Sequence, residues 1–317
     1  MNPLIKFIGA LIATKNYRIV RDNGMGFGGM EMFAKHYHGS ETKIATGVIE
    51  TENAVKAENV PVINNVFICF RTCLRNARNK NPKPRIDGHS VTDIGFAVAR
   101  SLVASVNRLA TETDLKLEVL ILDDRSDQES IDKLKDIFSK AHFTWALEQT
   151  TETGQGPSLL QQFEEARKRD ALCYFVEDDW LHEEDGILRM VQFYQHVLNS
   201  TGRHLVLTPQ EHHSHHINLL PTFLIAHSTG YWRTINHATH CLITHSEIIR
   251  DYWDVIENVK YVGTKKRKLG TEIATTNNIF NQYPAFAPTH PAAIHFQYDD
   301  ILPPLYDWRP LWKQFSD

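Results

Sequence analysis

Short apolar runs alternate with helical repeats through the first half of the chain. The apolar runs lie at 66–72, 117–122, 143–147 and 172–176, and polar residues follow each of them. Repeats with helical spacing lie between them, at 92–109, 126–139 and 158–169, and Ser126 is the expected N-cap of the second. This alternation predicts βαβ units and a parallel sheet flanked by helices.

The pattern loosens after residue 180. We expect helices at 184–198, 246–255 and 272–280 and strands at 204–207, 239–244 and 292–297. The chain therefore divides into an N-terminal extension of unknown role (1–60), a body (61–300) and an aromatic C-terminal tail (301–317). Within the body, a parallel half (61–180) precedes a more mixed half (181–300).

Composition is that of a soluble globular protein. The 317 residues are 42% apolar and 23% charged, and the net charge of −4 gives no reason to expect nucleic-acid binding. The four cysteines lie in apolar, strand-like runs without zinc-ligand spacing, which indicates reduced thiols and a cytoplasmic protein. The apolar stretch 3–13 is too short to span a bilayer, so membrane contact would be peripheral.

Acidic side chains follow two of the predicted parallel strands. Asp123 and Asp124 end one strand, and Glu177, Asp178 and Asp179 end another. The carboxyl ends of strands in open α/β sheets border the ligand crevice, and carboxylates suit Mg²⁺ or Mn²⁺. The competing interpretations are a solvated acidic turn for the triplet and a helix-start residue for Asp124.

Several motifs, taken in order, resemble one known family. Val66-Phe-Ile-Cys-Phe-Arg-Thr72, Ile121-Leu-Asp-Asp-Arg-Ser-Asp127 and Phe175-Val-Glu-Asp-Asp179 are similar to the nucleotide-binding half of GT-A-fold glycosyltransferases of the family-2 type. His240-Cys-Leu-Ile-Thr-His245, Gly270-Thr-Glu272 and Ile294-His-Phe-Gln297 are similar to the acceptor half of a spore-coat-type bacterial member. The resemblance covers about residues 62–300 and implies a GT-A-like, mostly parallel sheet and sugar transfer from a nucleotide donor, usually with a divalent metal.

The resemblance also assigns roles to single residues. Asp179 and His295 would hold the metal, and the donor nucleotide would contact Arg71, Thr72, Asp123, Asp124 and Asp178. Within that set, Asp124 would accept from the base imide, Arg71 would lie beside the base, and Asp178 would contact the ribose. Glu177 would be an outer acid. Without the resemblance, His295 would be interpreted as a core histidine.

Glu272 is the expected catalytic base. Inverting sugar transfer needs a carboxylate that removes the acceptor hydroxyl's proton, and the start of a helix would hold it rigidly at the cleft. Complementation of the helix dipole is the alternative role of a carboxylate at that position.

One segment departs from the family pattern. Family members often carry an arginine and an asparagine near the donor diphosphate, whereas residues 154–162 contain no arginine and place Gln162 near the asparagine's position. Either the donor differs or another cation reaches the phosphates. Lys265 and Lys266, in the basic loop 265–268, could close over the donor, although solvated side chains are the alternative.

Two further motifs stay outside the predicted site. The histidines at 212, 213, 215 and 216 lack a completing cysteine or acid pattern, so we interpret them as an acceptor-facing or solvent loop. Gly24-Met-Gly-Phe-Gly-Gly29 matches a dinucleotide fingerprint, but no second nucleotide-binding half follows it closely, so a turn is the favoured interpretation.

The sequence thus predicts a metal-dependent, inverting, hexosyltransferase-like enzyme of polysaccharide biosynthesis. It would use Mn²⁺ or Mg²⁺ and transfer a sugar from a nucleotide-diphosphate donor, with a UDP-sugar favoured, to a saccharide or other hydroxyl acceptor. The alternatives are a sugar-phosphate nucleotidyltransferase and a non-catalytic nucleotide-sugar-binding protein. The sugar, the acceptor and the oligomeric state remain open.

Overall fold

The computed structural model describes residues 48–50, 60–75, 85–211, 222–303 and 306–316. The first half of the body alternates strands with helices: β1 (Val48–Glu50), β2 (Asn65–Thr72), η2 (Ile86–Gly88), α3 (Val91–Glu112), β3 (Lys116–Asp123), α4 (Gln128–Phe138), β4 (Thr144–Gln149), α5 (Gln155–Arg167) and β5 (Leu172–Glu177). The second half of the body contains β6 (Trp180–His182), α6 (Gly186–Thr201), β7 (Val206–Leu207), β8 (Leu224–His227), β9 (Gly230–Thr234), β10 (Leu242–His245), α8 (Ser246–Asp251), α9 (Trp253–Ile256), η3 (Glu257–Tyr261), η4 (Arg267–Leu269), η5 (Glu272–Ala274), η6 (Thr276–Asn281), β11 (Ala285–Pro288) and β12 (Ala293–His295). The chain then forms η7 (Asp299–Ile301) and α10 (Arg309–Phe315).

A ten-stranded mixed sheet forms the centre, in the order β1-β8-β9-β11-β7-β10-β5-β2-β3-β4. Strands β5, β2, β3 and β4 are parallel, with β2 between β5 and β3. The centre of strand β2 is apolar because helices cover both faces of the sheet at this point, and Ile68, Cys69 and Phe70 have no exposed surface. The predicted α/β fold with a mostly parallel core is confirmed.

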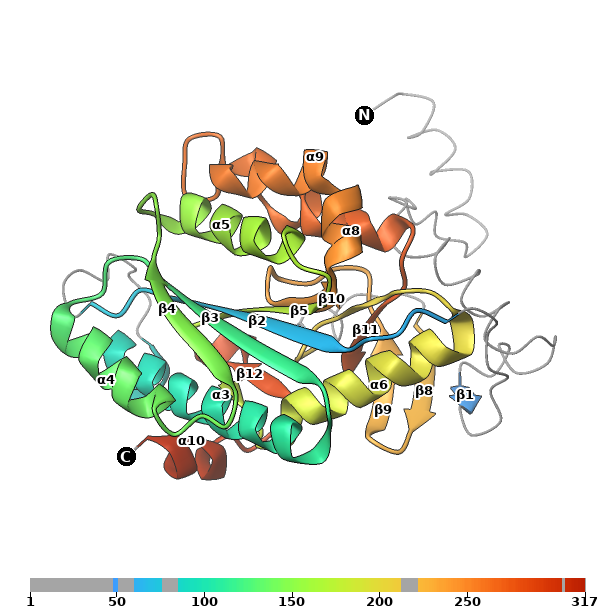
Figure 1. Cartoon of the computed structure of the whole chain (residues 1–317), viewed down its shortest axis with the longest axis horizontal. Helices are drawn as coiled ribbons and strands as arrows, with labels where there is room; N and C mark the ends of the chain where they lie inside the picture. The colour runs from blue at the N-terminus through green and yellow to red at the C-terminus, as the bar shows by residue number, and fades with distance from the viewer. Residues whose placement is uncertain (1–47, 51–59, 76–84, 212–221, 304–305, 317) are drawn as a thin grey trace, which may run out of the picture.

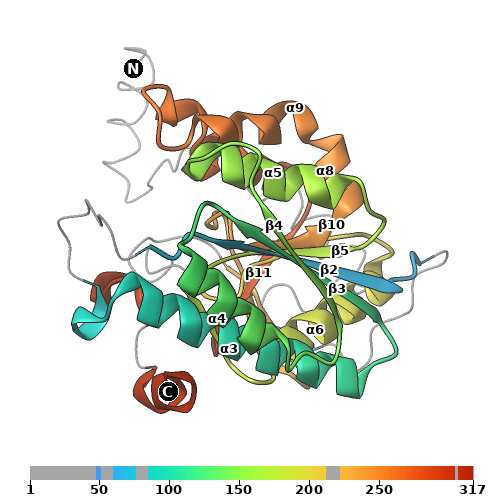
Figure 2. The same cartoon turned by 60° about the vertical axis from the view of Figure 1, so that its left-hand side comes forward.

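Helices cover both faces of the sheet (Figures 1 and 2). Helices α3, α4, α6 and α10 lie on one face, and α5, α8 and α9 lie on the other. Each layer buries its own apolar cluster, one with α3 and α6 and one with α5 and α8. The predicted tail joins the first cluster through Trp308, Leu311 and Phe315, so α10 packs against the body.

Several predicted boundaries differ from the structure. Helix α4 is capped by Asp127, whose side chain accepts from the backbone N–H of Ser130, and the predicted cap Ser126 contacts Asp123 instead. The expected helix at 272–280 consists of two short 3-10 segments, η5 and η6. Strands β8, β9 and β11 were not predicted.

The end of β5 leads into a second, two-stranded sheet. After the turn at Asp178 and Asp179, β6 pairs antiparallel with β12, which places His295 opposite Trp180. Helix α6 starts so close to β12 that a Cβ on Gly186 would lie 2.0 Å from the carbonyl oxygen of Ala292, so only glycine fits there. This packing brings a C-terminal strand to the acidic end of β5.

In the described part of the chain, no helix has both the length and the apolar character needed to cross a bilayer.

Candidate functional site

The two acid pairs lie on either side of strand β2, at the carboxyl edge of the sheet. Beyond β2, the backbone N–H of Cys73 donates to Oδ2 of Asp178 at 2.7 Å. On the other side, the hydroxyl of Thr72 donates to Oδ1 of Asp123 at 2.9 Å. The sheet therefore brings together the acidic ends of β3 and β5, as the strand pattern predicts. Cys73 itself lies beyond the end of β2, and not within a strand as expected.

Asp123 serves the turn after β3. Its carboxylate has no exposed surface, and it accepts from the backbone N–H of Ser126 at 2.9 Å as well as from the hydroxyls of Thr72 and Ser126. These internal donors satisfy the carboxylate, so Asp123 and Thr72 stabilise the protein structure next to the site.

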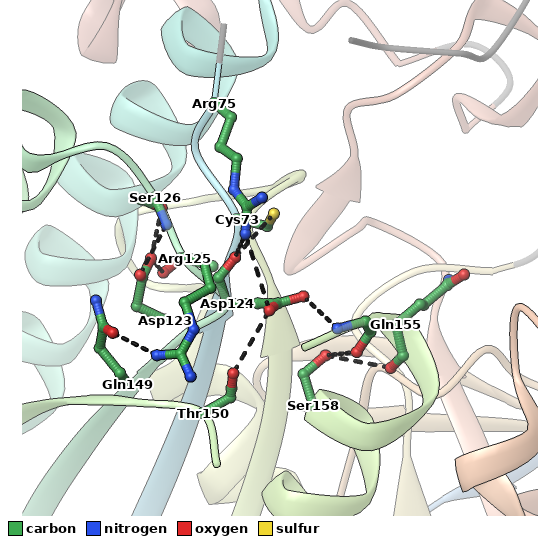
Figure 3. Close-up of polar contacts among 12 residues, drawn as sticks. Cys73, Arg75, Asp123, Asp124, Arg125, Ser126, Gln149, Thr150, Gln155 and Ser158 are labelled. Carbon is green, nitrogen blue, oxygen red and sulfur yellow. Dashed lines mark hydrogen bonds and ion pairs between the residues drawn. The ribbon is translucent and has the colours of Figure 1, made fainter. Parts of the chain in front are cut away.

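Asp124 lies between the end of β3 and the first turn of α5 (Figure 3). Its Oδ2 accepts from the backbone N–H of Gly154 at 2.9 Å, and its Oδ1 lies 3.5 Å from the hydroxyl of Thr150 and 4.0 Å from Nη2 of Arg75. Only 7% of the residue is exposed. The carboxylate thus holds the start of α5 through Oδ2. Its Oδ1 makes only the two longer contacts and can therefore accept a further hydrogen bond.

Arg71 and Glu177 form an ion pair at the floor of the site. Nη2 of Arg71 contacts Oε1 of Glu177, and Nη1 donates to the hydroxyl of Ser158 at 3.2 Å. Burial opposes the charge on Arg71, but the Glu177 carboxylate outweighs it and raises the pKa of the guanidinium. Arg71 therefore has a protein partner, whereas the sequence placed it beside the nucleotide base.

Gln162 lies inside the protein rather than at the surface of the site. Its amide nitrogen donates to the carbonyl oxygens of Cys69 at 2.6 Å and Val176 at 3.0 Å, and the residue is 1% exposed. Gln162 thus ties α5 to strands β2 and β5, and the expected contact to the donor would require those hydrogen bonds to break.

Asp179 and His295 meet where β5 passes into β6. Nε2 of His295 lies 3.4 Å from Oδ2 of Asp179, and this nitrogen and Oδ1 of Asp179 are both buried without a hydrogen-bond partner among the described residues. Oδ2 also accepts from the side-chain amide of Gln297 at 2.8 Å. The indole of Trp180 stacks on the imidazole of His295, with ring centres 4.7 Å apart.

Several ionisable side chains lie close together at the turn after β5. Burial would raise the pKa of Asp179, but His295 and Arg85 hold it below its ordinary value. Burial would lower the pKa of His295, but the Asp179 carboxylate raises it. Burial, together with the charge of Asp179, raises the pKa of Asp178 to about 7. A cation at this turn would relieve the repulsion between the adjacent carboxylates.

Glu272 lies at the start of η5, beside a histidine that the motif search did not single out as functional. Oε1 of Glu272 is 3.6 Å from Nδ1 of His240, and Nε2 of His240 is 3.3 Å from the hydroxyl of Thr275. Burial lowers the pKa of His240, while the charges of Glu272 and Glu177 act in the opposite direction. His240 thus connects Glu272 to the acidic end of β5. The Glu272 side chain is 41% exposed and accessible to an acceptor.

Segment η3, which precedes the basic loop, packs over the start of α5. A Cβ on Gly156 would lie 2.3 Å from the carbonyl oxygen of Lys260, so η3 touches the first turn of that helix. Lys265 and Lys266 are exposed in the turn that follows. The two lysines are thus exposed to solvent, and Nζ of Lys266 lies 5.5 Å from the ring centre of Tyr261.

Two arginines of the site lie at the ends of segment 75–85, which is basic and Pro-rich and was not part of the predicted site. Arg75 approaches Asp124, and Nη1 of Arg85 lies 3.9 Å from Oδ2 of Asp179. The signal that could have found them is the excess of cations directly after a strand that ends at the ligand edge.

A second group of ligand-type side chains, His204, His245 and Glu247, lies at the opposite edge of the sheet. His245 pairs with Leu172, the first residue of β5, whereas the acids follow its last residue. Nδ1 of His245 accepts from the backbone N–H of Glu247, so neutral His245 carries its proton on Nε2, 3.7 Å from Oδ1 of Asp170. This hydrogen bonding is that of a helix cap, and the group is separate from the site at Asp179.

The histidine cluster at 212–216 and the glycine motif at 24–29 lie outside the described residues.

Parallel strands thus carry carboxylates at their carboxyl ends, with a histidine beside them, as the family resemblance predicts. The family model for glycosyl transferase family 2 matches residues 96–253, about half of the chain. This match confirms the family-2-like resemblance that the motifs indicate. No curated protein matches it.

Similar solved structures include TarS of S. aureus, with 13% identity over 71% of this chain and a TM-score of 0.38. TarS 1-349 in complex with UDP-GlcNAc aligns with 11% identity over 73% of the chain and a TM-score of 0.39. The apo structure of the bifunctional glycosyltransferase WbbM aligns with 10% identity over 72% and a TM-score of 0.35. The alignments cover 36%, 57% and 38% of those three chains, respectively.

Proposed function

We propose that the chain transfers a sugar from a nucleoside-diphosphate donor, with UDP-sugars favoured, to a hydroxyl of a saccharide acceptor, with a divalent metal and inversion at the anomeric carbon. The observation that supports this most is the pair of Asp179 and His295 at the carboxyl end of β5. Both side chains are largely buried, and each has a ligand-type atom without a hydrogen-bond partner among the described residues.

The residues at this position fit a metal ion. A carboxylate oxygen and an imidazole nitrogen form a mixed ligand set, and the nitrogen favours Mn²⁺ over Mg²⁺, which prefers oxygen ligands. Such an ion supplies a Lewis acid that neutralises the charge developing on the leaving diphosphate. Trp180 holds the imidazole ring in place, and Gln297 fixes Oδ2 of Asp179, so Oδ1 is the atom left for a ligand.

The remaining residues suit the other parts of the reaction. Asp124 would accept a hydrogen bond from the base, and Asp178 would contact the ribose. The acceptor oxygen would attack the anomeric carbon as the bond from that carbon to the phosphate oxygen breaks, and Glu272 would take the acceptor's proton. His240 positions Glu272, because it lies 3.6 Å from the carboxylate and is itself held by Thr275.

A thermal-shift titration tests the proposal. We expect Mn²⁺ together with one nucleoside diphosphate to raise the melting temperature more than either alone, because a ligand that binds only the folded state stabilises it. If no nucleotide gives metal-dependent stabilisation, the donor site is refuted. Release of pyrophosphate from a nucleoside triphosphate and a sugar phosphate would instead show a nucleotidyltransferase. Donor binding without any turnover would show a binding protein.

We also propose that the protein works in the cytoplasm. All four cysteines are free thiols, and three of them are buried in the sheet region, which is consistent with a reducing, cytoplasmic environment. A sugar transfer of this kind would be a step of polysaccharide biosynthesis.

A further inference from the structure

We propose that Arg85 binds the diphosphate of the nucleotide donor and supplies the cation that the start of helix α5 lacks. The inference rests on the proposed function, because it takes the donor to be a nucleoside-diphosphate sugar.

The start of α5 offers no charge to a diphosphate. Residues 154–162 contain neither lysine nor arginine. Two of the polar side chains there are also engaged, since the hydroxyl of Ser158 accepts from Arg71 and the amide of Gln162 donates to two carbonyl oxygens. A diphosphate is held in proteins by cations and N–H donors, so its positive partners must come from other elements.

Arg85 has hydrogen-bonding capacity that the described residues leave unused. It precedes η2, its side chain is only 16% exposed, and its Nε and Nη1 atoms are buried without a hydrogen-bond partner among those residues. A buried guanidinium with two unsatisfied nitrogen atoms is unfavourable in the free protein. A bound anion with two or more oxygens would satisfy both nitrogens, because the guanidinium presents its donors as a planar fork.

The position of Arg85 beside Asp179 is not that of a structural ion pair. A charge-assisted arginine-carboxylate pair usually has short, parallel hydrogen bonds of about 2.7–2.9 Å. Here Nη1 lies 3.9 Å from Oδ2 of Asp179, and that oxygen already accepts from Gln297. The guanidinium carbon lies 5.3 Å from the ring centre of Tyr298, a cation-π distance that holds the group at the turn.

The charge around Asp179 also favours an anion there. A metal held by Asp179 and His295 would lie close to Arg85, and two such cations repel each other in a partly buried site. A diphosphate between them would turn that repulsion into two attractions. The metal and Arg85 would then hold the phosphates from two sides, and Asp179 would contact both cations.

The test compares Arg85→Gln and Arg85→Lys with the unchanged protein, using calorimetric titration with UDP, uridine and inorganic pyrophosphate, each with Mn²⁺. Because a hydrogen bond to a charged group contributes roughly 1.5–3 kcal/mol, we expect Arg85→Gln to raise the Kd of UDP and pyrophosphate by about 10- to 100-fold. Uridine binding should change by less than about twofold, and Arg85→Lys should recover part of the loss because it keeps the charge. Arg108→Gln, an exposed arginine paired with Glu112 in helix α3, is the matched control.

The possible results distinguish a failure of this inference from a failure of the proposed function. If the unchanged protein binds UDP or pyrophosphate and Arg85→Gln binds them equally well, Arg85 has no part in phosphate binding. Equal weakening of UDP and uridine, with a lower melting temperature of the free variant, would mean that Arg85 is structural. If the unchanged protein binds none of the three probes, the proposed function itself fails.

Discussion

His295 and Asp179 face each other at the junction of two sheets, with Nε2 of the imidazole 3.4 Å from Oδ2 of the carboxylate. Backbone pairing sets the histidine's position, because β12 runs antiparallel to β6 and places His295 opposite Trp180. Ring stacking sets its orientation, because the planes of the indole and the imidazole differ by only 8°. Two side chains with ligand-type atoms are thus held together by the fold itself, which is the arrangement that the proposed metal site needs.

Removing the Asp179 carboxylate should abolish this arrangement. For Asp179→Asn we expect Mn²⁺ affinity to fall by at least about 100-fold, because the amide lacks the negative charge that the ion requires. Calorimetric titration with Mn²⁺ measures the change. Asp178→Asn is the matched control for metal binding, because the neighbouring side chain accepts from Cys73 and has a pKa of about 7. An equal loss in both variants would show that Asp178 is also a ligand.

The second prediction concerns Glu272. We expect Glu272→Gln to lower kcat by about 10²- to 10⁴-fold, since the amide cannot take the acceptor's proton, while the KM for the donor stays nearly constant. The side chain is 41% exposed, so the unfolding free energy should change by less than about 0.5 kcal/mol. Steady-state kinetics with donor and acceptor varied separately gives both constants.

Glu257→Gln is the control for that experiment, because Glu257 is a partly exposed acid of the neighbouring η3 segment, paired with Lys260. Unchanged turnover in Glu272→Gln would remove Glu272 from the mechanism. A rise in donor KM with constant kcat would move it to the donor site.

The third prediction concerns stability in acid. His182 has no exposed surface, its Nε2 lies 2.9 Å from the hydroxyl of Tyr174, and burial lowers its pKa to about 3. The unfolded chain takes up this proton near pH 6.5 and the folded chain does not, so stability falls as the pH drops from 6.5 towards 3. The slope is about 1.4 kcal/mol per pH unit for this one group. Burial also lowers the pKa values of His204 and His227 to about 4, which adds to the slope.

Urea unfolding of His182→Gln at pH 7.0 and 5.0 tests this sign and size. The glutamine amide can still pair with Tyr174 but does not titrate, so the variant should lose about 2 kcal/mol less stability than the unchanged protein over that range. His142→Gln, at an exposed histidine, is the control. If His182→Gln shows the same pH dependence as the unchanged protein, His182 takes up its proton in the folded state.

The sequence predicts the strands that lead to the site better than it predicts which side chains pair there. Strands β2, β3 and β5 are recognisable because each has a continuous run of buried apolar side chains at its centre, and this places Asp124 and Asp179 at one edge. The partnership of Arg71 with Glu177 and that of His240 with Glu272 depend on the register between distant segments, which no local pattern encodes.

Short elements were also beyond the reach of periodicity. Strand β6 has three residues, too few to show an alternation, and its pairing with β12, which lies within the predicted strand at 292–297, is what brings His295 to Asp179. The interpretation of His295 as a metal ligand came from the family resemblance, because an isolated histidine on an apolar strand gives no chemical signal of its own.

Gly186 should control the proposed metal site from a distance, because it sets how closely helix α6 approaches β12. A Cβ at this position would lie 2.0 Å from the carbonyl oxygen of Ala292, a backbone atom that cannot turn away. Gly186→Ala must therefore displace the strand that carries His295, which we expect to destabilise the fold by about 1–3 kcal/mol and to weaken Mn²⁺ binding by at least about tenfold. Gly202→Ala is the matched control, since Gly202 ends the same helix with a φ of 66° and its replacement should cost about 1 kcal/mol without moving β12. Calorimetric Mn²⁺ titration and urea unfolding of both variants separate the two effects. If both lose stability but Gly186→Ala binds Mn²⁺ like the unchanged protein, the position of β12 does not govern the metal site.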